Sequence, residues 1–168
     1  MVARFWLLRT DTSLVANGTL PEQLNSTETY STADKDQATF RTIRLEMSRD
    51  ISSSMDRHSM NSINGSSMEM DVINERVTKG ELEVWSITAQ RMPHPFHIHG
   101  VSFQILTHHG KPPAEADRGW KDTVLVGNEP TEVIMRFNYE ADEKTPYMYH
   151  CHILEHEDGG MMGQFTVQ

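Results

Sequence analysis

The sequence predicts an all-β domain, either an antiparallel sandwich or a barrel. Three observations support this prediction: short runs rich in β-branched and aromatic residues, turn signals between them, and no long helical pattern. Several of the runs alternate apolar and polar side chains, which is the period of a half-buried strand. The runs are RFWLLR (4–9), FRTIRLEM (40–47), ELEVWSI (81–87), SFQIL (102–106), DTVLV (122–126), TEVIMRFNY (131–139), YMYHC (147–151) and GQFTV (163–167).

The segments between the runs hold Gly, Asn and Pro, which suit tight reversals of the chain. At 168 residues the chain is long enough for one domain with a core and too short for two comfortable ones. Its formal net charge of -9 argues against nucleic acid or an anionic membrane as the main partner. No run approaches the roughly 18 apolar residues of a membrane span, and the N-terminus lacks the apolar core of a secretory signal.

Two stretches of the chain are polar and lack strand periodicity. Residues 11–38 are rich in Ser, Thr, Asn and Asp, so we interpret them as a linker or an extended segment over a surface. The compact domain is then predicted to start near Thr39. The second stretch, 48–71, forms an insert within that domain, and its Ser and Asn content is poor for a core.

Three histidines stand close together in HPFHIHG: His94, His97 and His99. Residues two apart on a strand point to the same face, so His97 and His99 can act on one metal site. His94 is followed by Pro95, and we expect it to lie in a turn and to face elsewhere. The alternative, a surface patch of histidines, is disfavoured because the three stand so close in the sequence.

The only cysteine of the chain, Cys151, stands between His150 and His152. On a strand the two histidines share one face, and Cys151 projects from the other. A lone cysteine allows no disulfide within the chain, and it is usually a buried, inert thiol. Histidines on both sides disfavour that alternative and indicate two metal sites on opposite faces of one strand.

The cysteine begins a ligand pattern, C-x4-H-x4-M, formed by Cys151, His156 and Met161. A blue-copper site needs two histidines, one cysteine and a weak axial methionine, and His94 can supply the second histidine. Structural zinc sites usually show paired C-x2-C or H-x3-H spacing, which this segment lacks. The pattern therefore favours copper.

Methionine is frequent in the insert 48–71 and at its edge. The methionines are Met47, Met55, Met60, Met68 and Met70, and His58 lies among them. Thioether sulfur is a soft ligand suited to Cu(I), so the insert is either a flexible loop with incidental methionines or a copper-sequestering segment.

Together, HPFHIHG and HCHILEHEDGGMM resemble the pair of copper motifs in the C-terminal cupredoxin domain of bacterial multicopper oxidases. This family includes laccases, bilirubin oxidases and copper-efflux oxidases. The resemblance covers about residues 40–168 and includes GWKDTV (119–124). It implies a cupredoxin-like Greek-key β-sandwich and an extracytoplasmic location, periplasmic or secreted. In that family, electrons pass from a type 1 copper to a trinuclear cluster that reduces dioxygen to water.

The resemblance assigns roles to individual residues. Four would bind the type 1 copper: His94, Cys151, His156 and Met161. Four more would bind the trinuclear cluster, type 2 copper through His97 and the type 3 pair through His99, His150 and His152. Cys151 and Glu157 would take part in catalysis, Glu157 by helping to deliver protons to the dioxygen site. The alternative for Glu157 is a solvated loop carboxylate.

Copper-efflux oxidases bind substrate Cu(I) close to their type 1 site, and the resemblance implies three residues for that role: Met47, Asp50 and Met92. The match is incomplete. Gln90 stands where those oxidases carry an acid, and Asp50 follows Met47 at a different spacing. Oxidation of phenols is therefore better supported by the sequence than oxidation of Cu(I). The expected role in copper homeostasis depends on the oxidation of Cu(I).

The family's trinuclear cluster also takes H-x-H pairs from an N-terminal domain. Only His58, His108 and His109 are unassigned here, and they form no such pair, so this chain cannot complete the cluster alone. The segment VARFWLLR (2–9) resembles the last strand of a preceding domain, so we divide the chain into the end of that domain plus linker (1–38) and a cupredoxin domain (39–168).

Two functions follow from these assignments. In the first, the chain is part of an oxidase that takes electrons from phenolic or other organic substrates or from Cu(I), reduces dioxygen, and shares its trinuclear cluster with N-terminal cupredoxin domains in the same or another chain. In the second, it is a stand-alone blue-copper electron-transfer or copper-binding module without oxidase activity.

Overall fold

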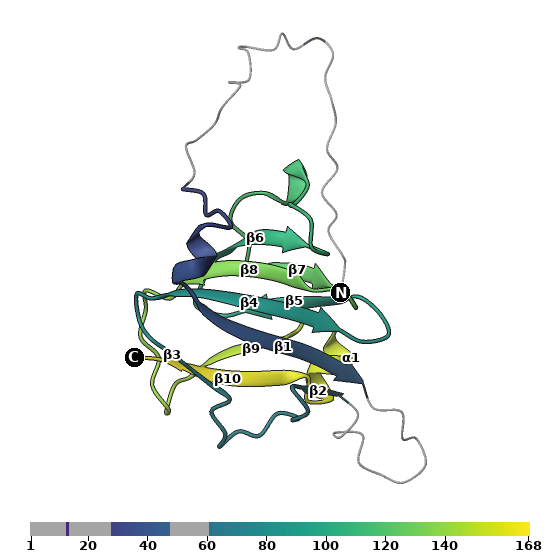
Figure 1. Ribbon diagram of the computed structural model, residues 1–168. Coiled ribbons are helices and arrows are strands. Elements are labelled where there is room, and N and C mark those ends of the chain that lie inside the picture. The colour runs from purple at the N-terminus through teal and green to yellow at the C-terminus, as the bar shows by residue number, and fades with distance from the viewer. Residues whose placement is uncertain (1–12, 14–27, 48–60) are drawn as a thin grey trace.

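Two five-stranded sheets pack face to face in the computed structural model (Figure 1). The structure describes residue 13 and residues 28–47 and 61–168. The strand orders are β2-β1-β4-β8-β6 in the first sheet and β3-β10-β9-β5-β7 in the second. Neighbours in these orders are often distant in sequence, which confirms the predicted Greek-key β-sandwich of cupredoxin type.

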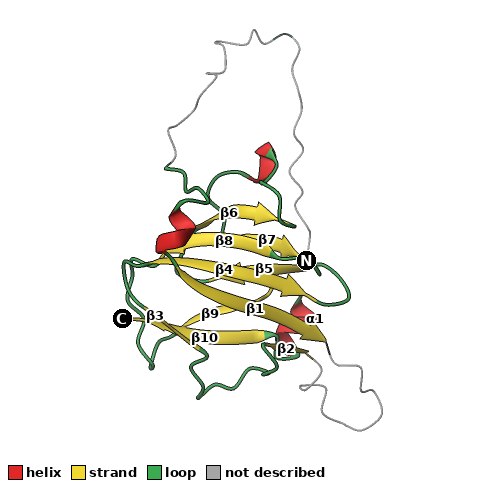
Figure 2. Ribbon diagram, in the orientation of Figure 1, coloured by secondary structure: helices red, strands yellow, loops and turns green. Residues whose placement is uncertain are grey.

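The elements have the following bounds. The first sheet holds β1 (Thr39–Met47), β2 (Asn61–Ile63), β4 (Leu82–Ala89), β6 (Phe103–His108) and β8 (Thr131–Arg136). The second holds β3 (Glu75–Val77), β5 (His94–Ile98), β7 (Thr123–Val126), β9 (Tyr147–Cys151) and β10 (Met162–Val167). The short helices are η1 (Asp34–Gln37), η3 (Glu115–Asp117) and α1 (Leu154–Asp158) (Figure 2). None of the described helices is long and apolar enough to cross a membrane.

Most predicted strands appear in the structure. Three strands that no predicted run covers, β2, β3 and β5, and three short helices appear as well. The run RFWLLR lies outside the described residues. The strands β2 and β3 were missed because three residues show no periodicity, and α1 was missed because five residues make barely more than one helical turn.

Two strand pairs are parallel, β1 with β4 and β3 with β10. The prediction of an antiparallel sandwich is therefore wrong for these pairs, although the remaining described ladders are antiparallel. Parallel neighbours cannot be joined by a tight hairpin, so the chain between them must cross over. Local turn signals in the sequence do not reveal such crossovers.

Aromatic side chains fill the space between the sheets. Trp85 on β4 packs edge-on against Tyr149 on β9, with ring centroids 5.4 Å apart, and both are buried. Tyr149 also lies so close to β10 that a Cβ at Gly163 would stand 2.5 Å from its hydroxyl. Only glycine fits there without displacing the ring. This packing holds β9, the strand with the cysteine, against β10.

A buried carboxylate lies beside this core. Glu83 is 1% exposed, and it accepts hydrogen bonds from Arg41 Nε at 2.6 Å and from Trp85 Nε1 at 3.0 Å. Arg41 Nη1 donates to Glu75 at 2.6 Å. A buried charge is tolerated only when it is paired and hydrogen-bonded. Arg41 is therefore needed to stabilise the buried carboxylate of Glu83.

The end of the predicted linker packs against the first sheet. Tyr30 donates its backbone N–H to the side chain of Gln104 on β6 at 3.0 Å, and its ring lies edge-on against Trp120. Lys35 pairs with Glu132 on β8 at 2.5 Å. Residues 28–38 thus contact the domain that follows, while the division of the chain at residue 39 stays a prediction.

Candidate metal centres

The neighbouring strands β5 and β9 carry four of the eight predicted copper ligands, and His99 and His152 directly follow the ends of these strands. Their register pairs Phe96 with Cys151 and His97 with His150. Because side chains alternate along a strand, Cys151 faces the buried interior while His150 lies on the outer face of the sheet. The structure thus gives the two opposite faces of β9 that the sequence predicts.

Three ligand atoms meet on the inner face. The distances are 3.4 Å from His94 Nδ1 to Cys151 Sγ, 3.6 Å from Cys151 Sγ to His156 Nδ1, and 3.1 Å between the two Nδ1 atoms. Nitrogen and sulfur ligands of one tetrahedral ion stand roughly 3.3–3.6 Å apart, given metal–ligand bonds of about 2.0–2.3 Å. The three atoms therefore fit a single metal ion.

The fourth predicted ligand of this site, Met161, follows the loop after β9 and lies next to Cys151 through its backbone. Met161 is fully buried, its carbonyl accepts from the Cys151 N–H at 3.1 Å, and its own N–H donates to the His156 carbonyl at 2.9 Å. We name His94, Cys151, His156 and Met161 the inner cluster. Two histidines, a thiol and a thioether form the donor set of a blue-copper site.

His94 itself lies in a strand, and the prediction that it occupies a turn is wrong. β5 starts at His94, which is paired with Val126 on β7. Pro95 cannot donate to a ladder, and this made a turn the natural expectation. Its carbonyl instead accepts from the His152 N–H at 2.7 Å, so β5 continues through the proline.

Burial sets the protonation of the inner cluster. Burial is the main cause that lowers the pKa of His94, with His156 adding to the effect, and burial also lowers the pKa of His156. Burial raises the pKa of the Cys151 thiol. At pH 7 the two imidazoles are therefore neutral and the thiol carries its proton.

We expect metal binding to the inner cluster at pH 7 to release about one proton per ion, from Cys151 alone. Isothermal titration calorimetry with Zn(II) in buffers of different ionisation enthalpy measures this number. The neutral histidines release almost no protons on binding the metal. Release of about three protons per ion would therefore contradict the pKa directions given above.

Four histidines gather on the outer face of the second sheet. His99 Nε2 lies 3.2 Å from His150 Nε2, and the ring of His97 lies 5.0 Å from that of His99. His152 is exposed, with its ring 5.8 Å from that of His97. We name these four residues the outer cluster. Of them, His97, His99 and His150 bring their ligand atoms close enough to hold one ion.

Two members of the outer cluster have their Nδ1 atoms held by the protein. His97 Nδ1 lies 2.9 Å from the Asp122 carbonyl and 3.0 Å from Thr123 Oγ1. His150 Nδ1 lies 3.1 Å from the Cys151 carbonyl and 3.3 Å from Glu157 Oε2. Such partners leave Nε2 free and fix the ring orientation, as they do around protein metal sites.

The sequence singled out Glu157 for proton delivery but did not predict its contact with His150. Nor did it single out the Asp122 carbonyl or the Thr123 hydroxyl, although both belong to the segment GWKDTV. A backbone carbonyl carries no signal in the residue type, so only the pairing of β5 with β7 reveals it. The role of Glu157 in proton delivery stays a prediction.

The residues proposed to hold substrate Cu(I) are placed only in part. Met47 ends β1 and packs, half-buried, against the core, whereas Met92 is exposed in the turn before β5. Asp50 lies outside the described residues. Gln90 has no side-chain carboxylate. Its backbone carbonyl lies 3.4 Å from His94 Nε2.

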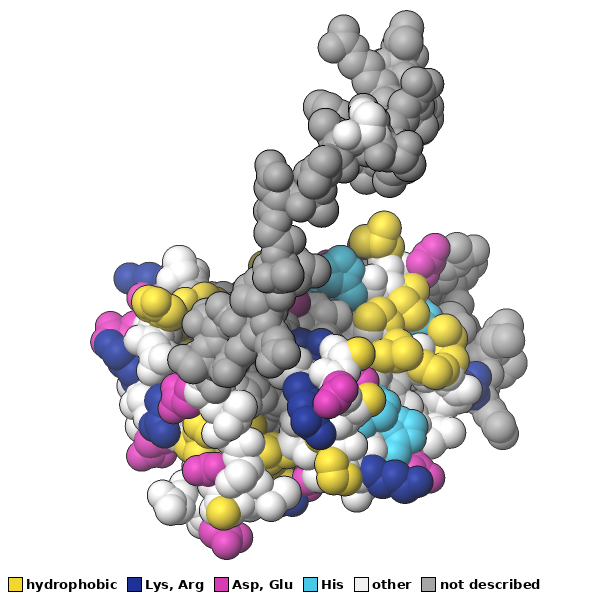
Figure 3. Space-filling model, turned by 90° about the horizontal axis from the view of Figure 1, so that it is seen from above, with side chains coloured by type: hydrophobic (Ala, Val, Ile, Leu, Met, Phe, Trp, Pro, Cys, Tyr) yellow, Lys and Arg dark blue, Asp and Glu magenta, His cyan; other side chains and the backbone are white. Residues whose placement is uncertain are grey.

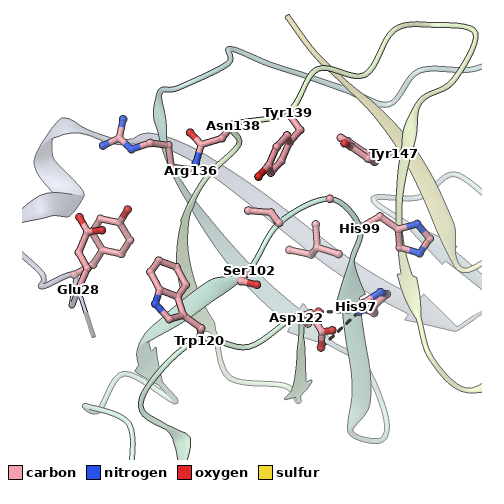
Figure 4. A pocket seen from close by; sticks show the side chains of 14 residues that line it. Glu28, His97, His99, Ser102, Trp120, Asp122, Arg136, Asn138, Tyr139 and Tyr147 are labelled. Carbon is pink, nitrogen blue, oxygen red and sulfur yellow. Dashed lines mark hydrogen bonds and ion pairs between the residues drawn. The ribbon is translucent and has the colours of Figure 1, made fainter. Parts of the chain in front are cut away.

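A wide-mouthed cavity of about 1080 Å³ lies beside the outer cluster (Figure 4). His97 and His99 stand at one end of it, Glu28 lies at the other, and Trp120 and Tyr139 line it in between. Figure 3 shows that histidine and hydrophobic side chains lie near one another on the face seen from above.

Comparisons with known proteins agree with the ligands and the fold. Residues 19–168 match the profile of the multicopper oxidase family. The chain is 40% identical over 111 residues to the multicopper oxidase mco of Staphylococcus aureus, a match that covers 62% of this chain and 24% of that protein. It is 38% identical over 104 residues to the cell division protein FtsP of Photorhabdus laumondii, covering 62% and 22%.

A similar solved structure is that of CueO, a bacterial laccase-like multicopper oxidase from Ochrobactrum sp.. It superimposes with a TM-score of 0.80 at 34% identity, covering 94% of this chain and 36% of that one. The chain thus spans about a quarter of the curated relatives and about a third of this structure. With a family profile that covers most of its residues and a cupredoxin sandwich that carries copper-type donors, the chain belongs to the multicopper oxidase family.

Proposed function

We propose that this chain is part of an oxidase that couples one-electron oxidation of phenolic or other organic substrates, or of Cu(I), to the four-electron reduction of dioxygen to water. The inner cluster holds the type 1 copper. The outer cluster supplies half of the trinuclear site, with His97 for type 2 copper and the other three histidines for the type 3 pair. Copper bound at these clusters supplies reversible one-electron chemistry.

The observation that supports this function most directly is the alternation along β9. Cys151 belongs to the inner cluster, and its immediate neighbours His150 and His152 belong to the outer one. One peptide bond therefore joins Cys151 to each of these two outer ligands. This arrangement suits the passage of single electrons between two centres, whereas a protein that only stored copper would gain nothing from it.

The partner in this proposal is an N-terminal cupredoxin domain, in the same chain or another. Within the part of the chain that the structure describes, the outer cluster has four histidines; His97 and His99 line the broad cavity, and His152 is exposed. The relatives named above are longer, with room for such a domain. An extracytoplasmic location and a link to copper homeostasis belong to the same proposal and rest on family resemblance.

Within the proposal, Glu157 orients His150 through the 3.3 Å contact and supplies a carboxylate for proton transfer next to the dioxygen site. Phenols are favoured as reductants over Cu(I), since Gln90 offers no carboxylate near His94. Met92 and Met47 stay candidates for holding Cu(I), because both carry soft thioethers.

Copper stoichiometry and spectroscopy test this proposal. The full chain, loaded with copper, should show a blue thiolate-to-copper absorption band and about one such ion per chain. Mixed or fused with its N-terminal domain, it should take up about four ions per unit and consume dioxygen with a phenolic reductant. A blue band without dioxygen consumption in that assembly would instead support a stand-alone electron-transfer module. A loaded chain without a blue band would overturn both functions.

A further inference from the structure

The connection between β4 and β5 contains a strained turn beside the inner cluster. Arg91 has φ 71°, in the left-handed region that residues other than glycine seldom occupy. The Met92 N–H donates to the Gln90 carbonyl at 2.9 Å, so residues 90–92 form a γ-turn with Arg91 at its centre. A γ-turn whose central residue has positive φ is rare and strained. Such strain persists only where the surrounding structure fixes the backbone.

The backbone on the N-terminal side of this turn is fixed from two directions. The Ala89 N–H donates to the Gly127 carbonyl at 2.7 Å, and the Gln90 N–H donates to the Leu45 carbonyl on β1 at 3.0 Å. The Arg91 side chain is exposed, and with the described residues it forms neither a hydrogen bond nor an ion pair. Side-chain contacts therefore do not explain why a residue other than glycine takes this conformation.

The turn presents the Gln90 carbonyl to a buried ligand of the inner cluster. This oxygen lies 3.4 Å from Nε2 of His94, which is fully buried and whose Nδ1 faces Cys151 and His156. When Nδ1 binds a metal, the proton of a neutral imidazole is on Nε2. A buried N–H needs an acceptor, and within the described residues the Gln90 carbonyl is the one in reach. The contact is longer than the usual 2.7–3.2 Å, in keeping with a carbonyl that also accepts from Met92.

We propose that Arg91 and Gln90 are positioning residues of the inner cluster: the strained turn at Arg91 holds the Gln90 carbonyl against Nε2 of His94. An outer partner of this kind fixes the tautomer and the ring orientation of a metal-binding histidine and raises its basicity. Because the partner is a backbone carbonyl, the conformation of residue 91 matters and the side chain of residue 90 does not. The inference rests on the proposed function only in that the inner cluster holds a metal, and it requires no reaction with dioxygen.

The carbonyl should influence the balance between the two oxidation states of bound copper. A more basic imidazole is a stronger donor, and Cu(II) gains more from it than Cu(I) does. Loss of an outer partner typically lowers metal affinity by about tenfold or more. We therefore expect loss of the Gln90 contact to weaken Cu(II) about tenfold more than Cu(I). For a one-electron couple this raises the reduction potential by about 59 mV.

The test compares two substitutions of one residue. Arg91→Gly and Arg91→Val both remove the guanidinium, but glycine accepts a φ near 71° without strain, whereas a β-branched residue does not. In the Zn(II)-loaded full chain, the Nε2 proton of His94 is followed by nuclear magnetic resonance. We expect it to exchange with water as slowly in Arg91→Gly as in the parent chain, and at least about tenfold faster in Arg91→Val. In the copper-loaded chain, only Arg91→Val should show the raised reduction potential.

Two control variants separate the turn from general effects. Gln90→Ala keeps the carbonyl and removes an exposed side chain, so it should match the parent in both measurements. His109→Val disturbs another left-handed residue, with φ 54°, in a turn that holds no inner ligand, and it should change neither. Arg91→Ala, which tolerates positive φ better than valine, keeps the comparison available if Arg91→Val does not fold.

The results that would overturn the proposal are equal exchange rates and potentials in the glycine and valine variants, or a change in Gln90→Ala as large as in Arg91→Val. Both measurements need only a metal in the inner cluster. A chain that passes them but consumes no dioxygen in the assembly with an N-terminal domain would contradict the oxidase function and leave this inference in place.

Discussion

Cys151→Ser should abolish the blue absorption band and lower oxidation of a phenolic substrate by more than about a hundredfold in the assembly with an N-terminal domain. The serine hydroxyl is a hard, neutral donor, whereas the buried thiol gives the thiolate that copper prefers. Absorption and paramagnetic resonance spectra of the loaded variant measure the first effect, and dioxygen uptake measures the second. The substitution is nearly isosteric, so we expect the fold to survive it.

A matched control for this prediction is Met162→Leu. Met162 neighbours Met161 in sequence, but it starts β10 opposite His150 and is only half-buried. Its replacement should leave the blue band in place. Dioxygen uptake that persisted in Cys151→Ser would show that electrons reach the dioxygen site without the inner cluster, and it would contradict the proposed function.

Arg41→Met should lower the free energy of unfolding by about 3 kcal/mol, which is a large fraction of the stability of a domain this size. Methionine keeps most of the apolar stem but leaves Glu83 charged, buried and without its cation. Equilibrium denaturation in urea, followed by tryptophan fluorescence, measures the loss. Trp85 reports on the site directly, because its indole N–H donates to the same carboxylate.

The control for this stability prediction is a second arginine–glutamate pair in the same domain. Arg76 bonds Glu143 at 2.9 Å, but both side chains are more than 60% exposed. Arg76→Met should therefore change the unfolding free energy by less than about 1 kcal/mol. An equal loss of unfolding free energy in the two variants would show that the burial of Glu83 does not determine the effect of removing its arginine.

Much of the metal-binding arrangement could be predicted because strand alternation is a local rule. The opposite faces of Cys151 and its two flanking histidines follow from a period of two, whatever the sheet around them. The position of His94 could not be predicted in the same way. Pro95 favours a turn locally, and only the pairing of β5 with two distant strands overrides that preference.

The groups that orient the outer histidines were equally hidden from the sequence. The Asp122 carbonyl holds His97 through backbone geometry, and any residue type would offer the same carbonyl. The contact between Glu157 and His150 depends on α1, a helix of five residues that is too short to show a helical pattern in the sequence. Local patterns thus predict which side chains can bind metal, whereas the pairing of strands distant in sequence determines the orientation of each imidazole.

The register of β9 has a consequence for how this protein tolerates change. A one-residue slip in a strand moves every side chain to the opposite face. Here such a slip would carry the cysteine to the surface and a histidine into the core, so both clusters would lose their ligands together. An insertion or deletion between Tyr147 and His152 should therefore destroy metal binding as well as destabilise the fold. The ladders that pair Phe96 with Cys151 and Met162 with His150 thus determine which ligands reach each metal site.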